Sequence, residues 1–237
     1  MSINDPKYHR FYQYRNQEIK WLCTDSEQRY QENLKNNYNN LKKYGWLDKE
    51  ISYKLNSEGF RSDDFSNDDS IVFFGPSITM GIGLSIEDIY PTLVANELKL
   101  KCFNLAIAGT SNDTSFRIAY TWLEKIKPKI VVFHSEWKER LELLDYDFSH
   151  NLSPAEVKSQ FYKIWLEVDE NSYLNKLKNS LAIQCLCQLH NIKFIELDRK
   201  STLNKYIDYE SEARDLLHPG PKAHRAYSDI ILKLIGA

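Results

Sequence analysis

Three residue types that support acyl transfer occur at positions where a chain can present them to a substrate. Ser77 follows a run of branched and aromatic residues, Ile71–Phe74, that is typical of a buried strand. Asp215 and His218 lie three residues apart, in a segment that cannot continue as a helix at Pro219. A serine nucleophile, a histidine base and an aspartate that orients the histidine together perform acyl transfer. We therefore interpret Ser77, His218 and Asp215 as candidate catalytic residues.

Each of these residues also has a purely structural interpretation. A serine close to glycines commonly stabilises a turn or caps a helix, and an Asp–His pair before a helix can be a surface charge and a capping histidine. Gly81 and Gly83 could instead cradle a phosphate, although the Lys-Ser/Thr of a Walker A motif is absent. Among the other histidines, His134 is a weaker candidate for the cleft, and His224 is expected to face solvent from the last helix.

A second group of candidate site residues follows the next predicted strand. Gly109 would let a backbone N–H approach a substrate closely, and the side chain of Asn112 could donate a hydrogen bond to an oxyanion. The alternative is an ordinary turn followed by a helix cap at Ser111, Asn112 or Asp113. In either case this segment is expected at the carboxyl edge of the sheet, where open α/β folds bind ligands.

The elements that must position these residues are visible from Ser70 onward. Short apolar runs predict strands, and apolar residues at helical spacing predict helices between them. This alternation predicts an α/β fold, with a parallel sheet covered by helices on both faces. The predicted strands are 71–74, 101–105, 129–133 and 192–197, and the predicted helices are 86–98, 113–126, a largely helical region from 153 to 190 with a break at 169–172, and 221–235.

The first part of the chain differs from the rest in composition. Residues 1–66 are rich in Tyr, Asn, Gln, Lys and Asp and have only scattered aliphatic residues. One or two amphipathic helices are predicted within about 16–43, followed by an irregular turn at 56–61. We therefore predict two parts, a helical N-terminal extension over 1–66 and an α/β domain over 67–237.

Length and composition exclude several other classes of protein. The 237 residues, 42% of them hydrophobic, are ample for one α/β domain plus an extension. A net charge of −2 gives no electrostatic case for binding nucleic acid or an anionic membrane. No apolar signal segment and no run of the ~18 apolar residues of a membrane helix is found, so a cytoplasmic protein is expected. The four cysteines match no zinc pattern, and we expect reduced thiols and no metal.

Three segments together resemble the motif blocks of the SGNH hydrolases, also called the GDSL lipase/esterase superfamily. Gly75–Gly81 resembles the first block, Asn104–Gly109 the second and Asp215–Pro219 the last. Leu55–Arg61 is also similar to the lead-in of some members, so the resemblance covers about residues 54 to 237. The blocks occur in the right order, and the first two lie in the expected strand context.

The resemblance implies a fold and residue roles. The implied fold is a three-layer α/β/α sandwich with a parallel, flavodoxin-like sheet of about five strands. The implied roles are nucleophile for Ser77, oxyanion-hole glycine for Gly109, and acid and base for Asp215 and His218. Neither a metal nor an organic cofactor is implied.

Two positions depart from the family pattern. Pro76 stands where the family usually has Asp, which removes a carboxylate and an N–H but leaves the N–H of Ser77. The third block normally carries an Asn after the third strand, whereas the stretch 133–140 has none. Because a lost oxyanion donor typically costs ~10²–10³ in turnover, low turnover is expected. Asn112 or Lys138 could replace this donor.

The function we predict is a serine esterase or acyl hydrolase that acts on an ester-bearing substrate, such as an acetylated glycan or a lipid. The alternative is a catalytically weak or inactive module on the same fold that recognises a glycan or a protein. Trp137, Lys138 and Arg140 are expected to rim the cleft, where the guanidinium of Arg140 would suit an anionic substrate group. Otherwise Arg140 pairs with Glu139 or Glu142 on a solvated helix.

Overall fold

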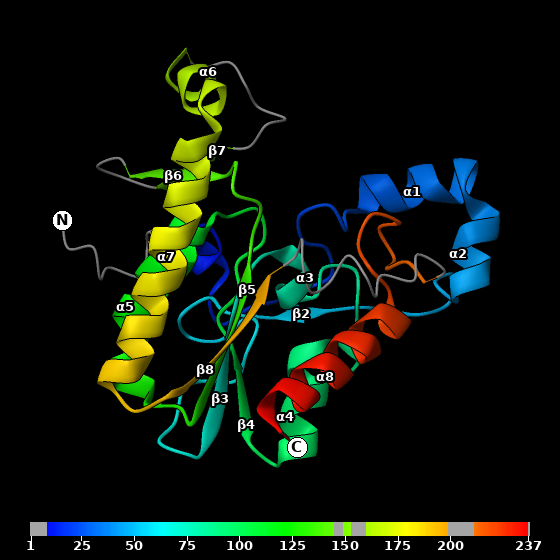
Figure 1. Ribbon diagram of the computed structural model, residues 1–237. Coiled ribbons are helices and arrows are strands. Elements are labelled where there is room, and N and C mark those ends of the chain that lie inside the picture. The colour runs from blue at the N-terminus through cyan, green and yellow to red at the C-terminus, as the bar shows by residue number, and fades with distance from the viewer. Residues whose placement is uncertain (1–8, 145–148, 153–159, 199–210, 237) are drawn as a thin grey trace.

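A parallel sheet of four strands forms the centre of the computed structural model, which describes residues 9–144, 149–152, 160–198 and 211–236 (Figure 1). The order β4-β3-β5-β8 places the first strand of this sheet between the second and the third, as in flavodoxin-like sheets. Among the described residues the sheet has four strands, where about five were predicted. They are β3 (Ser70–Phe74), β4 (Lys101–Asn104), β5 (Ile130–Ser135) and β8 (Lys193–Asp198).

Helices cover both faces of the sheet, which confirms the predicted three-layer α/β/α fold (Figure 1). On one face α4 (Tyr90–Leu98) packs against α8 (Pro221–Ile235). On the other face α5 (Asn112–Ile126) packs against α7 (Asp169–Leu189).

The strand side chains divide between two hydrophobic clusters, because successive residues of a strand point to opposite faces. Ile71 and Phe73 of β3 belong to the cluster under α4 and α8, whereas Val72 and Phe74 belong to the cluster under α5 and α7. Every residue of β3 is buried. This two-sided burial explains the uninterrupted apolar run in the sequence.

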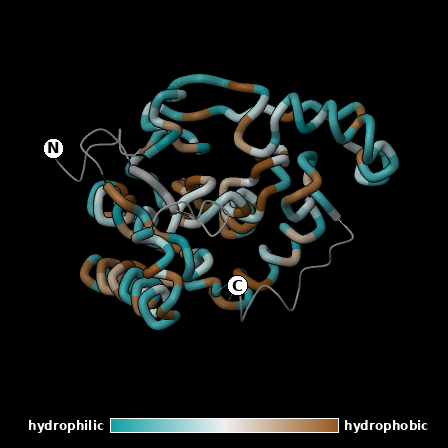
Figure 2. The backbone as a smooth tube through the Cα atoms, turned by 90° about the horizontal axis from the view of Figure 1, so that it is seen from above, coloured by the Kyte–Doolittle hydropathy of each residue, from teal (hydrophilic) through white to brown (hydrophobic). Residues whose placement is uncertain are grey.

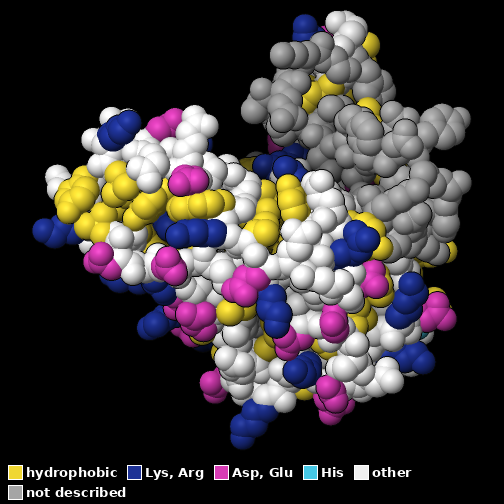
Figure 3. Space-filling view, turned by 180° about the vertical axis from the view of Figure 1, so that it is seen from behind, with side chains coloured by type: hydrophobic (Ala, Val, Ile, Leu, Met, Phe, Trp, Pro, Cys, Tyr) yellow, Lys and Arg dark blue, Asp and Glu magenta, His cyan; other side chains and the backbone are white. Residues whose placement is uncertain are grey.

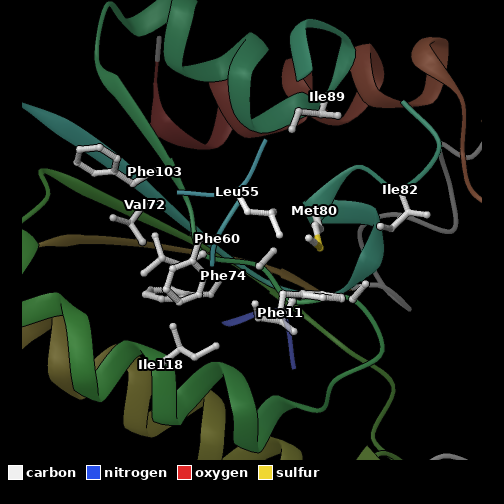
Figure 4. Close-up of a cluster of buried hydrophobic side chains, with 14 of the residues drawn as sticks. Phe11, Leu55, Phe60, Val72, Phe74, Met80, Ile82, Ile89, Phe103 and Ile118 are labelled. Atoms are coloured by element: carbon white, nitrogen blue, oxygen red, sulfur yellow. The ribbon is translucent and has the colours of Figure 1, made fainter. Parts of the chain in front are cut away.

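The N-terminal segment shares its hydrophobic core with the sheet. Phe11, Leu55 and Phe60 lie in one cluster with Val72 and Phe74 (Figure 4). The segment contains η2 (Tyr12–Tyr14), β1 (Glu18–Ile19), α1 (Glu27–Asn36), α2 (Tyr38–Tyr44) and β2 (Tyr53–Lys54).

Its helices are shorter than the predicted range 16–43. Ser26 begins α1 by accepting a hydrogen bond from the N–H of Arg29 at 3.2 Å, and β1 pairs with β2 instead of joining the helix. Figure 2 shows that α1 and α2 are mostly hydrophilic, as their composition predicts. Lys and Arg are interspersed with Asp and Glu over the face seen in Figure 3.

Two other predicted elements need correction. The predicted helix 86–98 divides into η3 (Ile86–Asp88) and α4, because Ile89 is extended and Pro91 lies in the first turn of α4. The break in the long helical region falls at the extended Val168, between α6 (Gln160–Glu167) and α7, not at 169–172.

A hairpin of β6 (Leu141–Leu144) and β7 (Ser149–Leu152) was not predicted. The helix start predicted at Ser153 lies outside the described residues. No helix in the described part of the chain is long and apolar enough to cross a membrane.

Candidate active site

Ser77 lies at the carboxyl end of β3, as the first residue of the short helix α3 (Ser77–Met80). The turn between strand and helix requires a glycine at position 75, where φ is +157°. A Cβ atom there would lie 2.3 Å from Thr79 Oγ1 and 2.9 Å from the Cβ of His134. The turn leaves Ser77 half-buried at the carboxyl edge of the sheet.

The structure brings Ser77, His218 and Asp215 together. His218 Nε2 lies 2.8 Å from Ser77 Oγ, and His218 Nδ1 lies 2.7 Å from Asp215 Oδ2. Because an ionised carboxylate only accepts hydrogen bonds, we assign the imidazole proton to Nδ1. Nε2 is then free to accept the hydroxyl proton of Ser77.

A closed loop presents Asp215 and His218 to Ser77. Its ends are joined by the β-bridge between Glu212 and Pro219 and by the bond from Ala213 N–H to His218 C=O at 2.9 Å. Inside the loop, Asp215 Oδ1 accepts bonds from the N–H groups of Leu217 and His218, both at 3.1 Å. This short-range turn explains the three-residue spacing of the pair in the sequence.

The Asp215 carboxylate is buried and saturated with donors. Its side chain is 0% exposed, and Oδ2 also accepts a bond from Thr24 Oγ1 at 2.7 Å. Burial by itself raises the pKa of this carboxyl group. The bonds and the charge of His218, together with the bonds from Thr24 and Leu217, outweigh burial and hold the pKa of Asp215 below its ordinary value. Asp215 is therefore ionised at neutral pH.

Gly109 lies on the loop that follows β4, beside the Ser77 turn. Leu105 N–H bonds to Phe73 C=O at 2.9 Å, and Ile107 N–H bonds to Gly75 C=O at 3.1 Å, which ties this loop to the end of β3. Gly109 is exposed, with φ of +76°. Within the described residues, the N–H groups of Ser77 and Gly109 have no hydrogen-bond acceptor.

The side-chain amide of Asn112 bonds to the backbone of Glu136 and is not available as a further donor. Its Oδ1 accepts a bond from Glu136 N–H at 2.7 Å, and its Nδ2 donates to Glu136 C=O at 3.3 Å. The residue is only 2% exposed. Both ends of the amide are thus occupied by the end of β5, so Asn112 joins α5 to β5 and is not among the oxyanion donors that we assign.

Arg140 lies beside the Gly109 loop but is already neutralised. Its Nη1 donates to Thr110 C=O at 3.2 Å and to Glu136 Oε2 at 3.1 Å. The carboxylate partner of Arg140 is therefore Glu136, and neither Glu139 nor Glu142. Glu142 pairs instead with the buried Arg117 at 2.7 Å.

Trp137 and Lys138 line a cavity of about 430 Å³ at the carboxyl ends of β5 and β8. Lys138 pairs there with Asp169 of α7, and 40% of Trp137 is exposed. The described residues that line this cavity do not include Ser77 or His218. These two candidates therefore lie at the same sheet edge as Ser77 but line a separate cavity.

Two other histidines lie under the site and not in it. His224 is buried, not solvent-facing as predicted, because it shares a helix face with Tyr227 and Ile231; its Nδ1 accepts the N–H of Tyr90 at 3.0 Å. Burial lowers the pKa of His224 to about 3, so it is neutral at pH 7. His134 is completely buried beneath Gly75, 3.3 Å from Tyr90 Oη.

The glycine-rich turn after Ser77 is filled by the protein itself, which excludes the phosphate-cradle alternative. Gly83 N–H donates to Tyr53 Oη at 2.8 Å. The buried guanidinium of Arg61 donates to the carbonyl groups of Gly81 at 2.6 Å and Leu84 at 2.7 Å. Burial lowers the pKa of Arg61 to about 10, so it remains charged at pH 7. In the described residues no cluster of His, Cys, Asp and Glu could hold a metal ion.

Sequence reasoning missed the part that the N-terminal segment plays at this site. Thr24 contacts Asp215, and the Arg10 guanidinium lies against Gly109, where an added Cβ would be 2.6 Å from Arg10 Nη1. No local pattern marks either residue, because each contact joins positions about a hundred residues or more apart.

Comparisons with protein-family models and with curated protein sequences find no match. Among solved structures, the chain is similar to TesA (12% identity, TM-score 0.40, 70% of this chain and 97% of that chain). It is also similar to the psychrotrophic esterase EstA from Pseudoalteromonas sp. (13% identity, TM-score 0.40, 71% of this chain and 97% of that chain). A third similar structure is the acetyl xylan esterase AlAXEase (18% identity, TM-score 0.37, 70% of this chain and 99% of that chain). At such low identities and TM-scores, these likenesses assign no residue roles, and the function proposed for this chain rests on its own side chains.

Proposed function

We propose that the chain is a serine esterase of the SGNH hydrolase type. The observation that carries this proposal is the continuous chain of short contacts from Ser77 Oγ through the His218 imidazole to Asp215, with distances of 2.8 Å and 2.7 Å. A capping serine or a surface ion pair would not require these three side chains to meet at the carboxyl edge of a parallel sheet.

In the first half of the reaction, Ser77 Oγ attacks the carbonyl carbon of the ester while its proton moves to His218 Nε2. The Asp215 carboxylate stabilises the imidazolium that forms and keeps its Nδ1 proton directed inward. The tetrahedral intermediate then collapses, the C–O bond to the alcohol breaks, and His218 Nε2 returns the proton to the leaving alkoxide. Ser77 is left as an acyl ester.

In the second half, a water molecule takes the place of the alcohol. His218 Nε2 accepts a proton from the water, whose oxygen attacks the acyl carbonyl carbon. Collapse of the second tetrahedral intermediate breaks the bond to Ser77 Oγ, which regains the proton from His218. The carboxylic acid is released, and no external oxidant, reductant or cofactor enters the balance.

Backbone N–H groups of Ser77 and Gly109 are the oxyanion donors that we assign. Both lie at the carboxyl ends of neighbouring strands, and within the described residues neither has an acceptor. Two such donors stabilise the charge that develops on the substrate oxygen. Because Asn112 is engaged elsewhere, we expect measurable but modest turnover, on a small-molecule or glycan ester.

A fluorophosphonate probe tests this proposal, because it phosphonylates only an activated serine. We expect the probe to label Ser77, as read from the modified peptide by mass spectrometry, and p-nitrophenyl acetate to be hydrolysed. Ser77→Ala should abolish both, whereas Ser66→Ala, outside the site, should change neither. A folded protein that is not labelled, or is labelled at another serine, would contradict the proposal.

A further inference from the structure

The N-terminal segment places a hydroxyl group on the Asp215 carboxylate. Thr24 Oγ1 donates to Asp215 Oδ2 at 2.7 Å, across 191 positions of the sequence. Thr24 lies in a tight turn in which Leu22 and Asp25 exchange two backbone hydrogen bonds, at 2.9 and 3.1 Å, and in which Cys23 has a φ of +57°. The turn geometry therefore fixes where the Thr24 side chain points.

The four bonds to the carboxylate divide evenly between its two oxygens. Oδ1 accepts from the N–H groups of Leu217 and His218, both inside its own loop. Oδ2 accepts from Thr24 Oγ1 and from His218 Nδ1. Since a carboxylate has about four acceptor sites, Thr24 fills the last one and leaves Oδ2 a single direction in which to meet the imidazole.

A buried ion pair holds the Thr24 turn against the Asp215 loop. Asp25, next to Thr24, accepts bonds from Arg214 Nη2 at 2.6 Å and Nε at 2.9 Å, and Arg214 is next to Asp215. These side chains are 2% and 1% exposed. Tyr53 Oη adds a bond to Asp25 at 2.6 Å. The residues next to Thr24 and Asp215 are thus bonded to each other. The Thr24–Asp215 contact therefore does not depend on one flexible side chain.

A second pair of bonds fixes the backbone of the same loop. Asn33 Nδ2 of α1 donates to Asp215 C=O at 3.4 Å, and Trp46 Nε1 donates to Glu212 C=O at 2.8 Å. The segment before the α/β domain therefore contacts this loop at three kinds of group, namely its backbone carbonyls, the buried Arg214 and the Asp215 carboxylate. The Thr24 bond is also one of the causes that lower the pKa of Asp215.

From these contacts we infer that Thr24 is a positioning residue of the active site, which acts through Asp215 to hold the His218 imidazole in the orientation that accepts the Ser77 proton. The inference rests on the proposed esterase function. It gives the N-terminal segment a positioning role at the active site, beyond its packing role.

Two substitutions of Thr24 separate positioning from packing. Thr24→Val keeps the shape of the side chain and removes the hydroxyl, and Thr24→Ser restores it. On p-nitrophenyl acetate we expect Thr24→Val to lower kcat roughly tenfold with KM changed less than about twofold, because a bond to a charged group is lost. Thr24→Ser should remain within about threefold of wild type. Thr121→Val, which removes another buried Thr hydroxyl, from α5, should leave kcat unchanged.

A proton NMR measurement tests the inference independently of turnover. The His218 Nδ1 proton, bonded to a carboxylate, should give a downfield signal that disappears in His218→Ala, shifts in Thr24→Val and returns in Thr24→Ser. An unchanged signal, with an unchanged kcat in Thr24→Val, would overturn the inference while leaving the esterase proposal intact. If the wild-type protein has no esterase activity, the proposed function is contradicted. The NMR comparison would still decide the role of Thr24.

Discussion

The loop 211–220, which carries Asp215 and His218, and the loop 105–111, which carries Gly109, are held in different ways on the two sides of Ser77. In the first, every acceptor site of the Asp215 carboxylate is filled, and the buried Arg214–Asp25 pair anchors the backbone. In the second, Gly109 is exposed, and its N–H has no acceptor within the described residues.

This difference matches the two tasks of a serine esterase. The acid–base side must hold an imidazole in one orientation and one tautomer, which requires a rigid and saturated carboxylate. The oxyanion side must offer donors to a charge that exists only during the reaction, so those donors must be unpaired beforehand. One site thus combines a closed half, the loop 211–220, and an open half, the loop 105–111.

The largest expected effect comes from the closed half. Asp215→Asn should lower kcat by about 10⁴, because the amide would support the wrong tautomer of His218. Steady-state hydrolysis of p-nitrophenyl acetate measures this. Asp229→Asn, on the exposed side of α8, is the matched control. A loss below tenfold would mean that Asp215 is not the orienting carboxylate.

Breaking the anchor of the same loop should mainly cost stability. Asp25→Asn leaves the buried Arg214 guanidinium without its counter-charge, and we expect a loss of about 3–5 kcal/mol in the free energy of unfolding. Asp69→Asn, which breaks the exposed pair with Lys129, should cost less than about 1 kcal/mol. Urea unfolding compares the two variants, and equal losses would show that the buried pair is not an anchor.

The pH dependence of stability tests whether His224 is buried in its neutral form. His224 belongs to α8, which begins where the 211–220 loop ends. Because the pKa of His224 is lowered to about 3, the unfolded chain binds a proton below about pH 6.5 that the folded chain does not bind. The free energy of unfolding is therefore unaffected by the titration of His224 above about pH 6.5 and decreases as the pH falls from 6.5 toward 3.

By pH 5 the loss should be roughly 2 kcal/mol relative to pH 8. His224→Asn keeps an acceptor for the N–H of Tyr90 without the titration, so the stability difference between wild type and this variant should shrink from pH 8 to pH 5. Urea unfolding at both pH values measures the difference. A difference that is independent of pH would contradict a neutral His224.

Two glycines with nearly the same backbone conformation test the open half. Gly109 has φ of +76° and Gly45 has φ of +78°, so an alanine at either position should cost about 1 kcal/mol in stability. At Gly45 nothing lies within 4 Å of the added Cβ, whereas at Gly109 the Cβ must displace the Arg10 guanidinium. We expect only Gly109→Ala to lower kcat, by several-fold. Equal kcat values for both variants would remove Gly109 from the oxyanion site.

The smallest expected effect concerns the two arginines beside the Gly109 loop. Arg140 is paired with Glu136, whereas in the described part of the chain Arg10 has no carboxylate partner. Arg10→Gln should therefore lower kcat/KM about threefold for an ester with a free carboxylate and leave a neutral ester unaffected. Arg140→Gln should show a smaller selectivity, and Arg15→Gln none. A larger selective loss in Arg140→Gln than in Arg10→Gln would instead indicate that Arg140 is the cation that binds the substrate carboxylate.

The sequence predicted the closed half of the site better than the open half. Asp215 and His218 are three residues apart, and their turn is made by local hydrogen bonds, so their proximity is readable from local sequence. The four strands follow from apolar runs that are buried on both faces. Asn112 was predicted as a possible oxyanion donor, but its amide bonds to the backbone of Glu136, which directly follows β5 and is marked by no sequence signal.

The contribution of the N-terminal segment could not be predicted for the same reason. Its composition predicted a helical extension and marked none of its polar residues as buried. Asp25, Asn33 and Arg61 are nevertheless buried, because their polar groups bond to distant backbone and side-chain atoms. Hydropathy alone does not distinguish a polar residue in solvent from a buried one whose hydrogen bonds are satisfied.

Trapping of the acyl-enzyme tests directly whether Ser77 is the nucleophile. Wild-type protein is mixed with p-nitrophenyl acetate, quenched in acid within the first turnover, digested and analysed by mass spectrometry. We expect one acetyl group, on the peptide that contains Ser77, and none in Ser77→Ala. Acetylation of another nucleophile, such as the exposed thiol of Cys23, or hydrolysis without acetylated Ser77, would contradict it.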